Sequence, residues 1–290
     1  MPDLAKLLLP VDFSERSIGA AHYARALALH FQSELLLVHV LAPLYSDMGG
    51  MEVTGSMLLD VYRTRAAGAE TELEAFASRH LADVRVRRLI LHGEPSSQIV
   101  ELAQGEAVGA IMMPTHGYGP FRSLLVGSIT AKVLHDAECP VWTATHVQEQ
   151  PAIHHVVSRN LLCAVDGTPK SAPLIQWAAE YAKVAGATLR LVHAVSGVVA
   201  WPDRQLDQEF QETLRKEARE AIERLQRSIG VAAPLCVAVG EVAGVVRAEA
   251  ERHDSDLILI GRGILHETMG RLRTHSYGII RQAPCPVLSV

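Results

Sequence analysis

The stretch at 114–128, PTHGYGPFRSLLVGS, combines two glycines with a serine just ahead of a helical pattern. Gly117 can adopt a positive φ angle and lets a ligand approach the backbone closely. Gly127 and Ser128 open the helix, whose free N–H groups and dipole favour an anion. The run PVD near the start ends in Asp12, whose carboxylate can accept hydrogen bonds from a ribose or an adenine amino group. These residue types suit a nucleotide, although an isolated loop of this kind is more often a turn and a helix cap.

Such residues act together only if parallel strands bring them to one edge of a sheet. Short apolar runs alternate with longer helical patterns along the whole chain, and runs such as KLLLPV and ELLLVHV are apolar throughout. This pattern is typical of strands covered by helices on both faces, joined by right-handed crossovers. In the first half we expect strands near 5–11, 34–41, 84–91, 109–114 and 140–145, and helices near 15–31, 57–81, 95–105 and 128–137.

The second half repeats the first. LLLPVDFSERS returns as LLCAVDGTPKS, and CPVW returns as CPVL. Asp12 and Asp166 are 154 positions apart, and so are His39 and His193. A constant offset of this kind indicates an internal duplication. In the second half we expect strands near 159–165, 187–195, 234–239, 256–261 and 285–290, and helices near 169–185, 204–229, 241–252 and 274–282.

The expected fold is therefore α/β, with two repeated, doubly wound, Rossmann-like domains, each a five-stranded parallel sheet flanked by helices. We place the domains at 1–147 and 158–290, with a polar linker at 148–157. Ligands of such sheets bind beyond the carboxyl ends of the strands, where the strand order reverses. The last strand of each domain is a natural edge for pairing between domains.

Composition excludes several classes of protein. The formal net charge of -5 argues against non-specific binding to nucleic acid or to acidic membranes, which needs a positive field. No apolar run approaches the roughly 20 residues that cross a bilayer, and the first residues do not resemble a secretory signal. The four cysteines are widely spaced without a C-x-x-C pair, which favours free thiols in a reducing cytoplasm.

The motifs PVDFSERS, LLLVHV, GEP, THG followed after nine residues by GS, and CPV together resemble the universal stress protein family. The resemblance covers both copies, so the chain is similar to a tandem member. It implies a five-stranded parallel fold, a tendency to form homodimers, and in many members ATP binding through G-x-x-G-x9-G-[ST]. Other members lack that motif and bind no nucleotide.

Carried over to this chain, the resemblance implies ATP as the ligand, with Mg²⁺ left open. Residues 10–12 would lie along adenine and ribose, Val40 would contact the base, and the glycines and serine of the loop would surround the phosphates. The expected contacts are Pro10, Val11, Asp12, Val40, Met113, Pro114, Thr115, His116, Gly117, Gly127, Ser128 and Ile129.

The chain departs from the motif in both copies. Pro114 stands where the family has its first glycine; proline has no N–H and fixes φ, so it weakens a contact there. In the second copy the loop is one residue shorter, and an arginine replaces the glycine at its end. We therefore favour a second site that has decayed and now only folds. A partial site would use Val165, Asp166, Gly261, Gly263, Arg273 and Thr274.

The leading interpretation is a stress-response regulator or sensor that binds ATP or a related adenine nucleotide in the first domain. A nucleotide-free interaction scaffold is the alternative. A slow ATPase is a third, and no catalytic residue is assigned, because the sequence lacks a P-loop lysine and an assured pair of magnesium ligands. The fourteen histidines show no metal-binding spacing, and we interpret His39 and His193, at equivalent positions of the two copies, as core or sheet residues.

Overall fold

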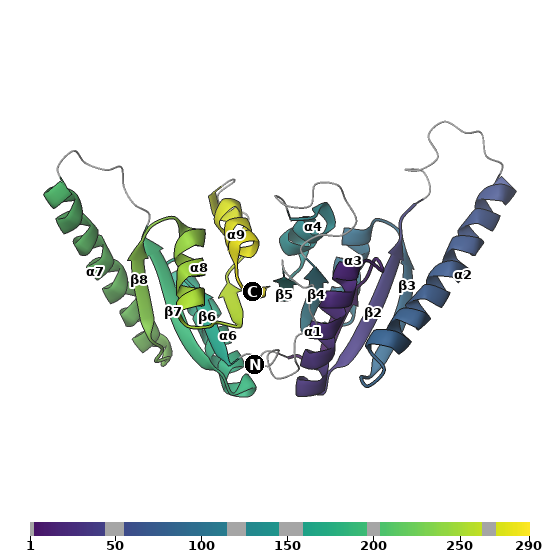
Figure 1. The fold of residues 1–290 in the computed structure, drawn as a ribbon, viewed down its shortest axis with the longest axis horizontal. Coiled ribbons are helices and arrows are strands. Elements are labelled where there is room, and N and C mark those ends of the chain that lie inside the picture. The colour runs from purple at the N-terminus through teal and green to yellow at the C-terminus, as the bar shows by residue number, and fades with distance from the viewer. Residues whose placement is uncertain (1–2, 44–54, 115–125, 145–158, 196–203, 263–270) are drawn as a thin grey trace. The chain divides into compact units, whose positions relative to one another are not determined.

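The computed structural model describes residues 3–43, 55–114, 126–144, 159–195, 204–262 and 271–290 (Figure 1). Contacts divide the chain into two compact units. The first consists mainly of Asp3–Val141, and the second of the described parts of Trp142–His146 and His154–Val290. The contacts thus divide the described chain within the last strand of the first repeat, and the domain limits expected at 147 and 158 stay a prediction.

In the first unit, strands and helices alternate as the sequence predicts. Four parallel strands take the order β3-β2-β1-β4. Helices α1 and α2 contact each other, as do α3 and α4, so one pair covers each face of the sheet. The elements are β1 (Lys6–Pro10), α1 (Glu15–Phe31), β2 (Glu34–Leu41), α2 (Gly55–His80), β3 (Val86–His92), α3 (Pro95–Gly105), β4 (Ala110–Pro114) and α4 (Ser128–Asp136). The last strand of the first repeat, β5 (Val141–Ala144), is the one that the unit boundary divides.

The core of this unit lies in the centre of its sheet. Leu8 and Leu9 of β1 and Leu36 of β2 are fully buried, and so are the residues next to them in each strand, whose side chains point to opposite faces of the sheet. A strand that buries successive residues must be covered on both faces. The apolar runs KLLLPV and ELLLVHV therefore form strands at the middle of the sheet rather than at its surface.

Helix starts follow local capping rules. Ser14 is the N-cap of α1 and accepts a 3.3 Å hydrogen bond from the backbone N–H of Ser17, which satisfies one of the donors that the first turn leaves open. Glu94 caps α3 in the same manner, and Pro95 occupies the first turn, where its missing N–H costs nothing.

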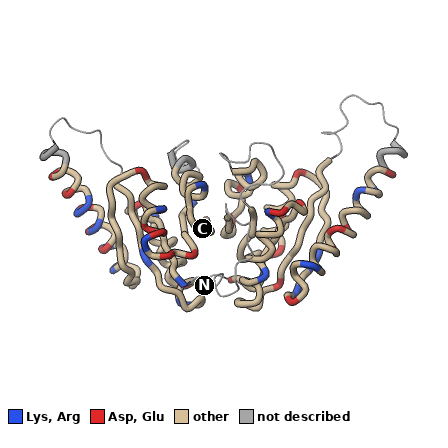
Figure 2. Tube along the Cα trace, viewed as in Figure 1, with Lys and Arg blue, Asp and Glu red and all other residues tan. Residues whose placement is uncertain are grey.

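The second unit repeats this architecture. Its parallel strands take the order β10-β9-β6-β7-β8, which confirms the duplication predicted from the sequence. Charges of both signs alternate along α7, as Figure 2 shows. The elements are β6 (Asn160–Ala164), the 3₁₀ turn η2 (Pro169–Ser171), α6 (Ala172–Ala185), β7 (Thr188–Val195), α7 (Arg204–Ile229), β8 (Leu235–Val239), α8 (Val242–Arg252), β9 (Leu257–Ile260), α9 (Arg271–Gln282) and β10 (Val287–Ser289).

The two units differ at the residue before β4 and β9. A Cβ atom on Gly109 would lie 1.7 Å from the backbone oxygen of Asp3, so only glycine fits. Asp256, its counterpart, accepts hydrogen bonds from the backbone N–H groups of Arg159, at 2.7 Å, and Asn160. In the first unit the backbone at Gly109 thus packs directly against the backbone of Asp3. In the second unit the carboxylate of Asp256 makes the connection to the neighbouring strand.

Candidate functional site

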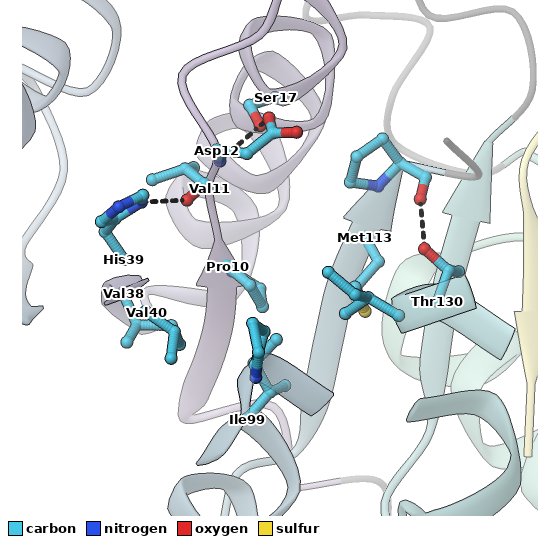
Figure 3. Close-up of a pocket in the computed structure, with 13 residues that line it drawn as sticks. Pro10, Val11, Asp12, Ser17, Val38, His39, Val40, Ile99, Met113 and Thr130 are labelled. Atoms are coloured by element: carbon cyan, nitrogen blue, oxygen red, sulfur yellow. Dashed lines mark hydrogen bonds between the residues drawn. The ribbon is translucent and has the colours of Figure 1, made fainter. Parts of the chain in front are cut away.

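A cavity of about 130 Å³ opens at the carboxyl ends of β1, β2 and β4 in the first unit (Figure 3). It lies where the chain, having built the sheet outward from β1 to β3, returns to add β4 on the other side of β1. This reversal of strand order is the usual ligand position in such sheets. Seven predicted contacts line the cavity: Pro10, Val11, Asp12, Val40, Met113, Pro114 and Ile129.

Aliphatic side chains and proline rings make up most of the cavity wall. Val11 and Met113 are 6% and 5% exposed, so their side chains are held by the core and present a dry, firm surface. Ile129, at the first turn of α4, is 39% exposed and stands at the rim. A wall of this kind favours a flat, weakly polar group such as a heterocyclic base.

Asp12 is the charged residue of the lining, and its carboxylate is firmly held. Its Oδ1 accepts hydrogen bonds from the hydroxyls of Ser14 and Ser17, both at 2.6 Å, and from the backbone N–H of Ser14 at 3.1 Å. The backbone N–H of Asp12 in turn donates to Ser17 Oγ at 3.1 Å (Figure 3). The start of α1 thus fixes the direction of this carboxylate at the cavity rim.

His39 orients the end of β1 from the neighbouring strand. Its Nδ1 lies 2.8 Å from the carbonyl oxygen of Val11 (Figure 3). A carbonyl only accepts, so Nδ1 carries a proton and donates. His193 makes the same 2.8 Å contact with the carbonyl of Val165 in the second unit. Both histidines are half-buried strand residues, at equivalent positions of β2 and β7, in agreement with their interpretation as core or sheet residues.

Pro114 and α4 are tied together on the other side of the cavity. Thr130 Oγ1 donates a 3.0 Å hydrogen bond to the carbonyl of Pro114. Gly127 is the N-cap of α4 with φ of −55°, and no side chain caps this helix. Ser128 is the first residue of α4, one position after the N-cap, and its side chain is exposed. Among the described residues, no side chain accepts a hydrogen bond at the cap of α4.

Six lining residues were not predicted from the sequence. Two of them belong to β2, and the other four belong to the helices α1, α3 and α4, which pack beside the strand ends. The repeated histidine at equivalent positions of both copies was a signal for one of them. The six are Ser17, Val38, His39, Pro95, Ile99 and Thr130.

Three predicted contacts, Thr115, His116 and Gly117, lie outside the described residues, as does Gly263 in the second unit. Arg273 and Thr274 fall in the first turn of α9, of whose side chains nothing is described. These parts of the expected sites stay predictions.

The second unit keeps the carboxylate arrangement but differs around it. Asp166 Oδ1 accepts hydrogen bonds from Ser171 Oγ at 2.6 Å and from the N–H and hydroxyl of Thr168 at 2.9 and 2.8 Å. Burial raises the pKa of Asp166, but these hydrogen bonds outweigh it and hold the pKa below its ordinary value. A Cβ on Gly261 would meet only Leu174 at 3.5 Å, an ordinary contact, so this position does not require glycine.

An ion pair links the two helices beside the cavity in the first unit. Lys132 of α4 lies 3.3 Å from Glu94 at the start of α3. Hydrogen bonds, the strongest from the hydroxyl of Ser96, lower the pKa of Glu94 to about 2. The carboxylate is therefore charged throughout the physiological range and adds negative charge near the rim.

Other chemical groups are dispersed in the part of the chain that the structure describes. All four cysteines are free, and only Cys163 is fully buried, where burial raises the pKa of its thiol to about 12. No three metal-ligating side chains come together among the described residues. None of the described helices is both long and apolar enough to span a membrane.

With this geometry established, comparison with known proteins identifies the class. The universal stress protein family model matches twice, at residues 4–144 and 158–290. The chain therefore belongs to the universal stress protein family and is a tandem member of it. The two matches correspond to the two repeats of strand order.

The chain is similar to individual relatives and solved structures. A universal stress protein of Thermus aquaticus is 32% identical over 135 residues, which cover 47% of this chain and 94% of the relative. The crystal structure of a universal stress protein from Archaeoglobus fulgidus covers 98% of this chain and 95% of its own, with 20% identity and a TM-score of 0.65. A universal stress protein solved in complex with cAMP covers 46% of this chain and 96% of its own, with 18% identity and a TM-score of 0.32.

Proposed function

We propose that this protein is a cytoplasmic stress-response regulator whose first unit binds ATP or a related adenine nucleotide. The observation that carries the proposal is the cavity at the reversal of strand order. There an apolar wall and the held carboxylate of Asp12 line one space, and Ile129 and Thr130 bring the first turn of α4 to it, next to Gly127 and Ser128, which do not line it. Each of the three matches a different part of a nucleotide.

The proposed pose follows from these chemistries. The base packs between Val11, Val40 and Met113, and the ribose hydroxyls donate to Asp12. The phosphates extend to Gly127 and Ser128, where the N–H groups and dipole of α4 favour negative charge. A cavity of about 130 Å³ is smaller than the roughly 300–1,000 Å³ of sites that enclose whole ligands, so the phosphates lie outside it. We expect any Mg²⁺ to bind through phosphate oxygens.

Calorimetric titration with ATP, ADP, AMP, cAMP and GTP tests the proposal. Asp12→Asn should weaken adenine-nucleotide binding by about tenfold or more, because a hydrogen bond to a charged group contributes about 1.5–3 kcal/mol. Asp166→Asn is the matched control. It alters the same kind of helix start in the second unit, which we expect to bind no nucleotide, and should leave affinity unchanged.

Two results would count against the proposal. One is a folded wild-type protein that binds none of these nucleotides. The other is equal loss of affinity in both aspartate variants, which would point to a general effect on folding. Light scattering on the same samples tests the further expectation of a homodimer.

Pro114 favours one alternative, a nucleotide-free interaction scaffold. This buried proline ends β4 and lines the cavity, and its ring takes the place of an N–H that a phosphate could have used. Replacing it separates the two functions. Pro114→Gly should strengthen adenine-nucleotide binding if the first unit is a nucleotide site, and should have no effect on a scaffold.

A further inference from the structure

A row of five rings runs from the cavity of the first unit to the contact between α1 and α2. His39, which lines the cavity, stacks on Phe13 with ring centroids 4.6 Å apart. Phe13 meets Phe76 of α2 edge-on at 6.2 Å, and Phe76 lies 4.9 Å from His80 one turn further along. His80 meets His22 of α1 at 5.7 Å. We call these five residues the ring row.

Phe13 is the strained member of the ring row. Its φ of 62° lies in the left-handed region, which is rarely populated by a bulky side chain and persists only where surrounding contacts hold it. The Phe13 ring contacts both His39, which it stacks on, and Phe76, which it meets edge-on. Because Phe13 lies between Asp12 and Ser14, its backbone conformation places the start of α1, whose Ser14 and Ser17 hold the cavity carboxylate.

The second unit provides an internal comparison. Gly167 takes the place of Phe13 with φ of 77°, which glycine adopts without strain. His193 still bonds the carbonyl of Val165 at 2.8 Å, and Asp166 still accepts from Ser171. The polar arrangement is thus the same in both units, but no ring at position 167 connects it to a helix.

The far end of the ring row can change its charge in mild acid. Burial and then Arg25 of α1 lower the pKa of His22, while burial, then His22 and Arg79 of α2, lower that of His80. Asp83, after α2, pairs with Arg25 through its carboxylate. Burial is thus the main cause of both shifts, and the cationic neighbours add to it, so protonation is disfavoured at both packed histidines.

The sign of the effect follows by linkage. Both histidines bind a proton more weakly in the packed arrangement than in an open one, where the ordinary value of about 6.5 applies. The packing is therefore fully stable above about pH 6.5 and loses stability as the pH falls below it. Histidine is the side chain whose ordinary pKa places this change within the range of cellular acidification.

We propose that the ring row is an acid-sensitive control of the first-unit cavity. Protonation of His22 and His80 separates α2 from α1, which withdraws Phe76 from Phe13. Phe13 then relaxes out of its left-handed conformation and releases Asp12. The inference rests on the proposed function only for the identity of the ligand that such a change would release.

Hydrogen exchange of the ligand-free full chain tests the coupling. Exchange at about pH 7.5 and about pH 5.5 is corrected for the intrinsic rates, and the peptide containing Val11 and Asp12 is compared with that containing Val165 and Asp166. We expect protection of the first peptide to fall in acid, by up to roughly tenfold for each of the two histidines, because about pH 5.5 lies one unit below their ordinary pKa of about 6.5. Protection of the second peptide should stay constant.

Two variants separate the proton from the ring. His22→Phe combined with His80→Phe keeps both rings and removes both titrating groups, so the acid response should disappear. Phe76→Leu interrupts the ring row and leaves both histidines in place. Their titration should continue, but the exchange of the Val11–Asp12 peptide should no longer depend on pH. An acid response that is equal in both units, or that survives in the double variant, would overturn the proposal.

A titration with ATP at both pH values distinguishes this inference from the proposed function. No binding at about pH 7.5 together with acid-sensitive exchange means that the ligand was assigned wrongly and the coupling is correct. Equal ATP affinity at both pH values in a wild type with pH-independent exchange means that the nucleotide site is correct and the coupling is wrong.

Discussion

The hydroxyl of Thr130 and the carbonyl of Pro114 form a 3.0 Å hydrogen bond that joins the first turn of α4 to the end of β4. Thr130 is 4% exposed, so the bond is protected from water. It holds together the two elements on either side of residues 115–125. The rim of the candidate site thus depends on a contact between residues sixteen positions apart.

Replacement of Thr130 by valine tests this contact. Valine has nearly the same shape but no hydroxyl, so the buried carbonyl of Pro114 is left without this donor. We expect the free energy of unfolding to fall by about 1–3 kcal/mol, measured by urea denaturation. Thr130→Ser keeps the donor and should lose less; a serine variant as unstable as the valine variant would show that packing, not the hydrogen bond, matters.

Gly109 and Gly68 form a matched pair for alanine substitution. A Cβ on Gly109 would lie 1.7 Å from the backbone oxygen of Asp3, so Gly109→Ala must displace backbone and should cost about 1–3 kcal/mol or more. Gly68 is exposed within α2 with nothing near its Cβ position, and Gly68→Ala should stabilise by about 0.5–1 kcal/mol. Thermal unfolding of both variants should shift in opposite directions.

Glu94 should contribute to the acid sensitivity of the fold. Its pKa of about 2 lies below the ordinary 4.5, so its stabilisation is present above about pH 4.5 and is lost as the pH falls toward 2. Its side chain is 46% exposed, so solvent screening limits the contribution to about 1 kcal/mol or less. Glu94→Gln should flatten the pH dependence of urea unfolding in this window. Ser96→Ala should flatten it partly, and an unchanged slope in both variants would contradict the prediction.

Asp166 provides a direct titration test in the second unit. Its lowered pKa depends on hydrogen bonds from Ser171 and Thr168 that oppose the effect of burial. Ser171→Ala should therefore raise the pKa of Asp166, and the stability linked to this group, present above its ordinary 3.8, should decrease. Carboxyl carbon chemical shifts measure the pKa. Ser17→Ala makes the corresponding change beside Asp12 and should leave Asp166 unaffected.

Much of the fold could be predicted from the sequence because its signals are local. The runs around Leu8 and Leu36 are apolar without alternation, which only a strand covered on both faces requires. Ser14 caps the helix that follows it, as its type and position suggest. Because Asp12 and Asp166 are in register, the duplication predicts that the second unit has the same strand order as the first, which the structure confirms.

Half of the cavity was beyond such reasoning. Pro95 and Ile99 reach it because a right-handed crossover places α3 on the same face as α4, a fact about the sheet and not about their own neighbours in sequence. Nothing in the type of His39 says that its Nδ1 will meet the carbonyl of Val11, which belongs to another strand.

Local sequence thus determined which segments become strands and helices, because propensity, capping and burial act over a few residues. It also determined that the segments occur twice. Only the tertiary structure decided which side chains converge, since the ring row joins His39, Phe76 and His22 from β2, α2 and α1. Contacts between distant segments depend on the packing of whole elements, and that packing is set by the sum of many contacts rather than by any one motif.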